Sequence, residues 1–344
     1  MSSNSFEVDT YLSSVPSDKS GMTVVYALTS NGQDIYTAMT RVSVASVRVS
    51  NPSVNITVAC DTVSDRAIRF TNSPLIKEVD NWIVCQTPEG DAGFRNRHVK
   101  TRLRQIINGP FLFLDSDTFV RGDISEIFGL DTDIAGSPNH SKDTLEEQIW
   151  EQDAAVLTAM NWQVGSKVYI NGGVMFYNDT QKAFQFSADW HRRWLLSYER
   201  LQNYRDQPAL NSALFTTEVR LKVMSHDFNV QIRQSLSVNK EPIVWHYYSS
   251  VNRDAITAFD ILVQKILEGA QLDLTAISKM ISCRHPWRCD SKIDDWIARR
   301  VITRGHINEW EATWFSGRKV VALKQLFKTF FKRPSNPTLT IKQD

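Results

Sequence analysis

The feature that most constrains the fold is a wholly apolar run, Phe111-Leu-Phe-Leu114, which leads directly into Asp115-Ser-Asp117. Gly109-Pro110 separates this run from a helical pattern before it, so the run is expected to be a short strand. A strand without polar alternation is typical of a central, mostly parallel sheet that helices cover on both faces. Ligands bind at the carboxyl ends of such strands, so the two carboxylates stand where a ligand would lie.

The start of the chain predicts the same class of fold. Residues 23 to 28 are apolar and β-prone, and the polar turn Thr29-Ser-Asn-Gly32 follows them. A helical stretch then extends to about Ser50, and Val54 to Ala59 reads as a second strand. This βαβ order predicts an α/β, Rossmann-like sheet with a first loop suited to a nucleotide.

A single helix is predicted from Asn96 to Asn108. Its apolar residues recur at helical spacing, and three cations, Arg97, Lys100 and Arg104, fall on the opposite face. One face would pack and the other would be cationic. Surface cations are usually just solvated, and that interpretation stays open here.

The rest of the chain divides into sheet elements followed by helices. Strands are expected at 168–177 and 242–247, and helices at 181–204 and from 207 onward. Beyond residue 252 only helical patterns occur. We therefore expect a disordered polar tail at 1–20, a catalytic domain at 21–252, a helical C-terminal region at 253–334 and a disordered polar tail at 335–344.

Composition excludes several classes of protein. A formal net charge of +1 over 344 residues gives no reason to expect a nucleic-acid partner. No segment resembles a signal peptide or a membrane span, which favours a cytoplasmic location. The four cysteines are expected to be free thiols. Cys283, His285 and Cys289 raise the question of a zinc site, but their spacing is unusual for one and no fourth ligand is evident.

The pair Asp115 and Asp117 suits a hard divalent cation. Two oxygen ligands one residue apart fit Mg²⁺ or Mn²⁺, which complete their shell with waters and substrate phosphates. The same Asp-x-Asp spacing also arises as ordinary turn chemistry. The pair alone does not decide between these interpretations.

Four segments in order resemble the glycogenin-like, family 8 glycosyltransferases, which have the GT-A fold. Residues 111–128 resemble the family's Asp-x-Asp region, and Tyr169-Ile-Asn-Gly-Gly-Val-Met-Phe-Tyr-Asn178 resembles its Asn-(Ser/Ala)-Gly-Val strand. Asp206-Gln-Pro-Ala-Leu-Asn211 resembles its Asp-Gln-x-x-Leu-Asn motif, and Val244-Trp-His246 resembles the strand that carries a metal-binding histidine. The resemblance spans about residues 23 to 248.

The resemblance implies a retaining transfer of a sugar from a nucleotide-diphosphate donor, most often a UDP-sugar, to a carbohydrate, lipid-linked or protein hydroxyl. It assigns a Mn²⁺ or Mg²⁺ ion to Asp115, Asp117 and His246, and catalytic positions to Asn171, Asp206 and Gln207. The implied donor-binding residues are Ala27, Leu28, Thr29, Arg97, Lys100, Arg104, Asp115, Ser116, Asp117, Gly172 and Gly173.

Structural alternatives remain for several of these residues. A lone histidine between Trp245 and Tyr247 is often a core residue, Asp206 has the place of a helix N-cap, and Gly172-Gly173 fits a β-bulge. Each of these alternatives is compatible with a residue that also binds substrate.

Two segments depart from the family pattern. After His246 the family shows a glycine, a lysine and Pro-Trp, whereas this chain continues to Arg253 without them. Arg253 is the nearest substitute for the lysine, one position late. The loop after the first strand has Thr29, Ser30 and Asn31 in place of an acidic pair, with Asp34 further on.

Two rival functions remain open. Phe111 to Val120 also fits the first motif of haloacid dehalogenase-like phosphatases, in which Asp115 would be the nucleophile. That reading needs a second acidic pair at a strand end, and Asp294-Asp295 lies in a helical context. The other rival is a catalytically inactive nucleotide-sugar binder, suggested by the altered segment after His246.

The segment 318–333 predicts a basic amphipathic helix. Six cations alternate with apolar residues, and the segment contains no acid. Such a helix either lies on an anionic membrane surface or packs its apolar side on the catalytic domain.

Overall fold

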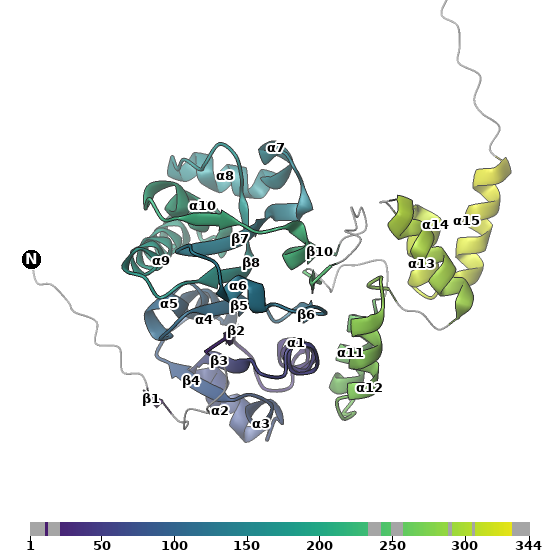
Figure 1. Cartoon of the computed structure of the whole chain (residues 1–344), viewed down its shortest axis with the longest axis horizontal. Coiled ribbons are helices and arrows are strands. Elements are labelled where there is room, and N and C mark those ends of the chain that lie inside the picture. Colours follow the sequence, from purple (N-terminus) through teal and green to yellow (C-terminus); the bar gives the residue numbers. More distant parts are fainter. Residues whose placement is uncertain are drawn as a thin grey trace, which may run out of the picture.

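The computed structural model describes residues 11–12, 21–232, 242–248, 257–287, 291–304 and 307–331. At the centre of this described part lies an eight-stranded sheet that contains both parallel and antiparallel strands (Figure 1). Its strands, in spatial order, are β1 (Tyr11–Leu12), β4 (Asn81–Cys85), β3 (Asn55–Asp61), β2 (Thr23–Leu28), β5 (Phe111–Leu114), β8 (Ile170–Tyr177), β7 (Ile134–Pro138) and β9 (Leu221–Val223).

Four adjacent strands of the sheet are parallel, as expected, although the edge strand β1 pairs antiparallel with β4. β4, β3, β2 and β5 are successive parallel neighbours, and β8 then pairs antiparallel with both β5 and β7. A second, three-stranded sheet contains β10 (Val230–Gln231), β11 (Val244–His246) and β6 (Thr118–Val120). The strand expected at 242–247 therefore forms, but in this small sheet.

Helices cover both faces of the main sheet. One face packs against α1 (Ile35–Ser50), α2 (Thr62–Phe70), α3 (Leu75–Glu78) and α6 (Ser125–Phe128). The other packs against α4 (Ala92–Lys100), α5 (Leu103–Ile106), α9 (Gln181–Leu201) and α10 (Gln207–Thr216). Short elements over the β7 and β8 end are the 3₁₀ turns η1 (Asn139–Ser141) and η2 (His226–Asn229), with α7 (Leu145–Gln148) and α8 (Glu151–Met160).

Strand β5 is the buried central strand that the sequence predicts. Leu112 and Leu114 belong to the core on the α1 side, and Phe111 and Phe113 belong to the core on the α4 side. Successive side chains of a strand point to opposite faces, so a strand with helices on both sides must be apolar throughout.

Two expectations differ from the structure. The helix expected from Asn96 to Asn108 is broken: α4 ends at Lys100, Thr101 caps it, and α5 begins only at Leu103. Within the tail expected at 1–20, Tyr11–Leu12 form the edge strand β1 and pair antiparallel with β4.

The C-terminal region is helical where it is described. Its helices are α11 (Ala258–Leu267), α12 (Leu274–Ser282), α13 (Lys292–Arg304), α14 (Glu309–Phe315) and α15 (Lys319–Phe331). They share one hydrophobic core with α1 and with Phe119 and Trp245 of the small sheet, and α11 and α12 lie beside α1 (Figure 1). Among the described helices, none has the length and apolar character to span a bilayer.

Candidate active site

Asp115, Asp117 and His246 converge at the carboxyl end of β5. Asp117 precedes β6, and β6 pairs antiparallel with β11, so that Thr118 lies opposite His246. His246 Nε2 lies 3.2 Å from Asp117 Oδ1 and 4.0 Å from Asp115 Oδ2. One ligand atom from each residue lies within 4.8 Å of the others. Two carboxylate oxygens and one imidazole nitrogen form a donor set that fits Mn²⁺ or Mg²⁺.

The absence of a side chain at Gly173 makes this convergence possible. A β-carbon there would lie 2.3 Å from Cε1 of His246 and 2.9 Å from Oδ2 of Asp115. The backbone of Gly173 also accepts a 2.8 Å hydrogen bond from the N–H of Asp115. The glycine is therefore part of the wall of the site, beyond any role in bending β8.

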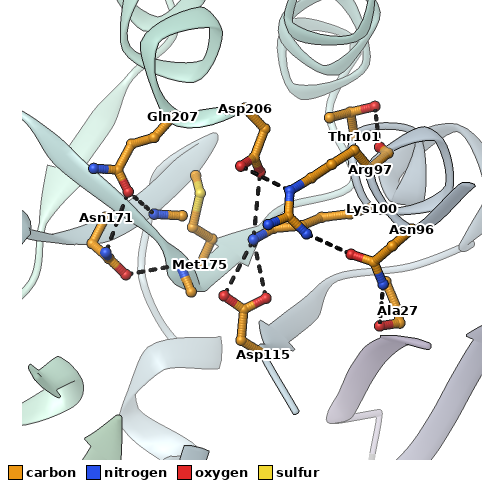
Figure 2. A network of polar contacts seen from close by, with 12 residues as sticks. Ala27, Asn96, Arg97, Lys100, Thr101, Asp115, Asn171, Met175, Asp206 and Gln207 are labelled. Carbon is orange, nitrogen blue, oxygen red and sulfur yellow. Dashed lines mark hydrogen bonds and ion pairs between the residues drawn. The ribbon is translucent and has the colours of Figure 1, made fainter. Parts of the chain in front are cut away.

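Lys100 bridges the carboxylates of Asp115 and Asp206 (Figure 2). Its ammonium donates to both oxygens of Asp115, at 3.0 and 3.2 Å, and lies 3.5 Å from Asp206 Oδ2. The lysine is only 5% exposed, which excludes the interpretation of a solvated surface cation. A buried ammonium held in this place can bind anionic oxygens of a ligand.

Arg97 completes this charged group. Its Nε lies 3.2 Å from Asp206 Oδ1. Burial opposes ionisation of Asp206, but the charges of Lys100 and Arg97 outweigh it and hold the pKa of that carboxyl below its usual value. Burial also lowers the pKa of Arg97, and the carboxylates of Asp206 and Asp115 more than compensate, so the pKa rises. Asp206 and Arg97 therefore both stay ionised at neutral pH.

The side chain of Asp206 faces this cluster. It occupies the N-cap position of α10, but it makes no capping hydrogen bond. The capping alternative therefore does not account for its carboxylate.

Two cavities meet beside Asp115 and Asp117. One has a volume of about 670 Å³, and the other has a volume of about 260 Å³. Both are lined by Arg97, Asp115, Asp117 and Tyr204, so these residues stand where the two cavities join.

The smaller cavity contains the expected residues Ala27, Thr29 and Ser116. It also contains Tyr36, from the first turn of α1, and Asn96, whose amide donates to the carbonyl of Ala27 at 3.2 Å (Figure 2). Sequence reasoning missed these two residues, although Asn96 lies one position before Arg97 on a helix that was already singled out.

The larger cavity contains Asn171, Gly172-Gly173, Asp206 and Gln207, all as expected. Gln207 Oε1 accepts from Asn171 Nδ2 and from the N–H of Gly172, each at 3.3 Å (Figure 2). It is also lined by residues that were not expected, among them Asn139, His140, Trp150, Asp153, Arg205, Gln231 and Tyr248. They come from five separate segments, so no local pattern marks them.

Two expected donor-binding residues lie elsewhere. Arg104 is fully buried: it donates to the carbonyls of Gly109 and Ile107, pairs with Asp179, and lies over the Phe111 ring. The break after α4 turns it away from the face that carries Arg97 and Lys100. The side chain of Leu28 belongs to the core on the α1 side, because in β2 it alternates with Ala27.

Of the two segments that depart from the family pattern, the structure describes the loop after the first strand but only the beginning of the segment after His246. Asp34 caps α1 by accepting from the N–H of Thr37, so its carboxylate serves the helix. Arg253 and residues 249–252 lie outside the described residues, as does Cys289. Cys283 is a free thiol, 3.5 Å from His285 Nε2.

Comparison with known proteins identifies the family of the chain. The family model described as Glycosyl transferase family 8 matches residues 27–251. No curated protein matches the sequence. Among solved structures, a galactosyltransferase LgtC in complex with donor and acceptor sugar analogs is similar at 17% identity, covering 66% of this chain and 87% of that one, with a TM-score of 0.47.

Two further structures show similar agreement. Mouse xyloside xylosyltransferase 1 is 12% identical, and the match covers 67% of this chain and 98% of that chain with a TM-score of 0.44. The glycosyltransferase GlyE of Streptococcus pneumoniae TIGR4 is 17% identical, with 75% and 62% covered and a TM-score of 0.45. The family match over 27–251 contains Asp115, Asp117 and His246 and the residues that line both cavities.

Proposed function

The chain belongs to glycosyl transferase family 8 and is a glycosyltransferase, and we propose that it moves a sugar from a nucleotide-diphosphate donor, preferably a UDP-sugar, to a hydroxyl acceptor with retention of configuration. The observation that carries this proposal is the convergence of Asp115, Asp117 and His246 beside the buried Lys100, where two cavities meet. Asp115, Asp117 and His246 would hold a Mn²⁺ or Mg²⁺ ion, which would supply positive charge to offset the charge of the departing diphosphate.

The residues around the ligands divide the remaining work. Lys100 and Arg97 bind the diphosphate oxygens, since they are the cations that face the junction of the two cavities. Asn171 and Gln207 orient hydroxyls of the donor sugar, and the carboxylate of Asp206 offsets positive charge at the anomeric carbon. Because Gly172 and Gly173 have no side chains, the anomeric end of the sugar can approach the backbone closely.

The acceptor hydroxyl enters through the larger cavity. Its polar lining suits a carbohydrate, and a lipid-linked or protein hydroxyl can reach the same cavity from outside. The phosphatase alternative loses its second acidic pair, because the buried Asp294 is bound by Lys319 and Trp314 on the C-terminal helices.

A thermal-shift screen tests the donor proposal. UDP, GDP and their sugars are added with Mn²⁺ to the wild-type chain and to Asp117→Ala, since a ligand that binds the folded state raises the midpoint of unfolding. We expect the UDP compounds to stabilise the wild type and to lose most of this effect in the variant. Asp123→Ala, at an aspartate between β6 and α6, is the control and should respond like wild type.

Product analysis separates the rival functions. With a UDP-sugar and Mn²⁺, slow release of UDP is expected even without an acceptor, and phosphomonoesters should not be cleaved. Cleavage of phosphomonoesters would favour the phosphatase, and donor binding without any UDP release would favour the inactive binder.

We further propose that α15 contacts an anionic membrane surface. Val320, Leu323 and Phe327 are 68%, 41% and 59% exposed on α15, close to the exposed cations Lys324 and Lys328. The opposite side of α15 is already packed against α14 through Ala322. The exposed apolar side therefore stays uncovered by the described residues, and its cations match an anionic surface.

A further inference from the structure

A chain of side-chain amides runs from the proposed sugar site to the metal-binding histidine. Gln207 Oε1 accepts from Asn171 Nδ2 at 3.3 Å, Asn171 Oδ1 accepts from Asn229 Nδ2 at 2.9 Å, and Asn229 Oδ1 lies 2.9 Å from His246 Nδ1. Asn229 ends the 3₁₀ turn η2 and is fully buried. Nothing in the sequence pattern singled it out.

The backbone determines which way the amide of Asn171 points. Its Oδ1 accepts a 2.9 Å hydrogen bond from the N–H of Gly173, and a backbone N–H can only donate. Its Nδ2 must then donate on the other side, to Asn139 Oδ1 at 3.0 Å. Asn139 is itself oriented independently, because its Nδ2 donates to the carbonyl of Gln148. The N–H of Gly173 and the carbonyl of Gln148 thus require the same orientation of the Asn171 amide.

This orientation passes on to Asn229 and then to His246. Because Asn171 Oδ1 is an acceptor, the group of Asn229 that faces it must be the donating Nδ2. The carbonyl oxygen of Asn229 therefore faces His246 Nδ1, and an amide oxygen can only accept. His246 must therefore carry a proton on Nδ1, and Nε2, 3.2 Å from Asp117 Oδ1, is the ring nitrogen that faces the two aspartates.

We propose that Asn229 is the positioning residue that holds the metal ligand His246 in the Nδ1–H tautomer, with Nε2 presented to the metal. The inference rests on the metal site of the proposed function. A histidine that ligates a metal through one nitrogen depends on the partner of the other for its orientation and basicity. Here that partner is an amide whose direction the backbone of Gly173 sets through Asn171.

Nitrogen NMR of the wild-type chain tests the tautomer directly. The protein is labelled with ¹⁵N-histidine and loaded with Cd²⁺, a diamagnetic stand-in for Mn²⁺, without any donor. The expected result is a protonated Nδ1 and a ¹⁵N–¹¹³Cd coupling at Nε2 of His246, a signal assigned by its loss in His246→Gln. Coupling at Nδ1, or an unprotonated Nδ1, would overturn the proposal.

Metal affinity tests the role of Asn229 itself. Mn²⁺ binding to the donor-free protein is measured by calorimetry for wild type, Asn229→Leu and Asn51→Leu. Asn51 is a matched control, since it is a buried asparagine bonded to backbone groups at Gly122 and Ile124.

We expect Asn229→Leu to weaken Mn²⁺ binding by about 10- to 100-fold and Asn51→Leu to leave it unchanged. Equal affinities in wild type and Asn229→Leu would overturn this inference alone. No Mn²⁺ binding by the wild type would overturn the metal site and this inference with it.

Discussion

Gly173 packs directly against the imidazole of His246, where a β-carbon would lie 2.3 Å from Cε1. Contacts this short do not occur between real atoms, so any side chain at position 173 must move the histidine or the strand β8. His246 and Asp115 thus approach β8 at a distance that only glycine at position 173 allows.

Replacing Gly173 with alanine is expected to disrupt metal binding more than folding. The histidine or Asp115 is displaced, and we expect calorimetry to show Mn²⁺ affinity lowered by at least about tenfold, about 1.4 kcal/mol. Gly172→Ala is the matched control, because its β-carbon would meet only the ends of two flexible side chains, Leu210 Cδ2 at 3.3 Å and Lys100 Nζ at 3.8 Å. Equal Mn²⁺ affinities in the two variants would contradict this role for Gly173.

Arg97 and Arg104 are expected to behave differently although they lie on one predicted helix face. Arg97→Gln should weaken binding of UDP with Mn²⁺ by about tenfold, because it removes a charged donor from the cleft. Arg104→Gln should leave UDP affinity unchanged and lower the free energy of unfolding by about 2 kcal/mol, because it removes buried hydrogen bonds to backbone carbonyls. Titration calorimetry and urea unfolding check the two effects.

A loss of UDP affinity in Arg104→Gln, with folding intact, would show that Arg104 reaches the donor after all. An unchanged affinity in Arg97→Gln would remove that arginine from the proposed diphosphate site.

His98 and His191 predict a loss of stability in acid. Their rings meet edge to face at 4.8 Å. Burial lowers the pKa of His98 to about 4, and burial together with the charge of His98 lowers that of His191 to about 3. In the unfolded chain these histidines become protonated near pH 6.5, whereas in the folded chain they stay neutral to a lower pH. Their contribution to the free energy of unfolding is therefore fully present above pH 6.5 and is lost as the pH drops toward 4.

Between pH 7 and pH 5, each histidine should lower the free energy of unfolding by about 2 kcal/mol. Urea unfolding of wild type and of the His98→Phe, His191→Phe double variant at both pH values measures this. The double variant should show a smaller loss between pH 7 and pH 5, and an equal loss would place the acid sensitivity in other groups.

The exposed side of α15 predicts binding to anionic vesicles. A Leu323→Ser, Phe327→Ser variant should co-sediment less with vesicles that contain phosphatidylserine, because burial of these two side chains stabilises the bound state. Phe70→Ser is the control, since Phe70 is 88% exposed on α2, outside the cationic helix. If both variants bind the vesicles as strongly as wild type, α15 is not the part of the chain that contacts the membrane.

The sequence predicts the fold best where a pattern is local. Phe111 to Leu114 alone indicates a central strand, and the strand end alone places Asp115 and Asp117 at the ligand edge. The break after α4 was not predicted, because Val99 and Leu103 keep helical spacing across it. That break is the reason why Arg104 packs inside while Lys100 faces the cleft.

By itself, the sequence determined the class of sheet, the place of the two aspartates and, through four ordered segments, the family. Only the tertiary structure decided which distant side chains meet them. Asn229 touches His246, and Tyr36 and Tyr204 line the cleft, because separate elements pack together there. Periodicity reports the direction of a side chain within its own element, whereas contacts between elements depend on how those elements pack.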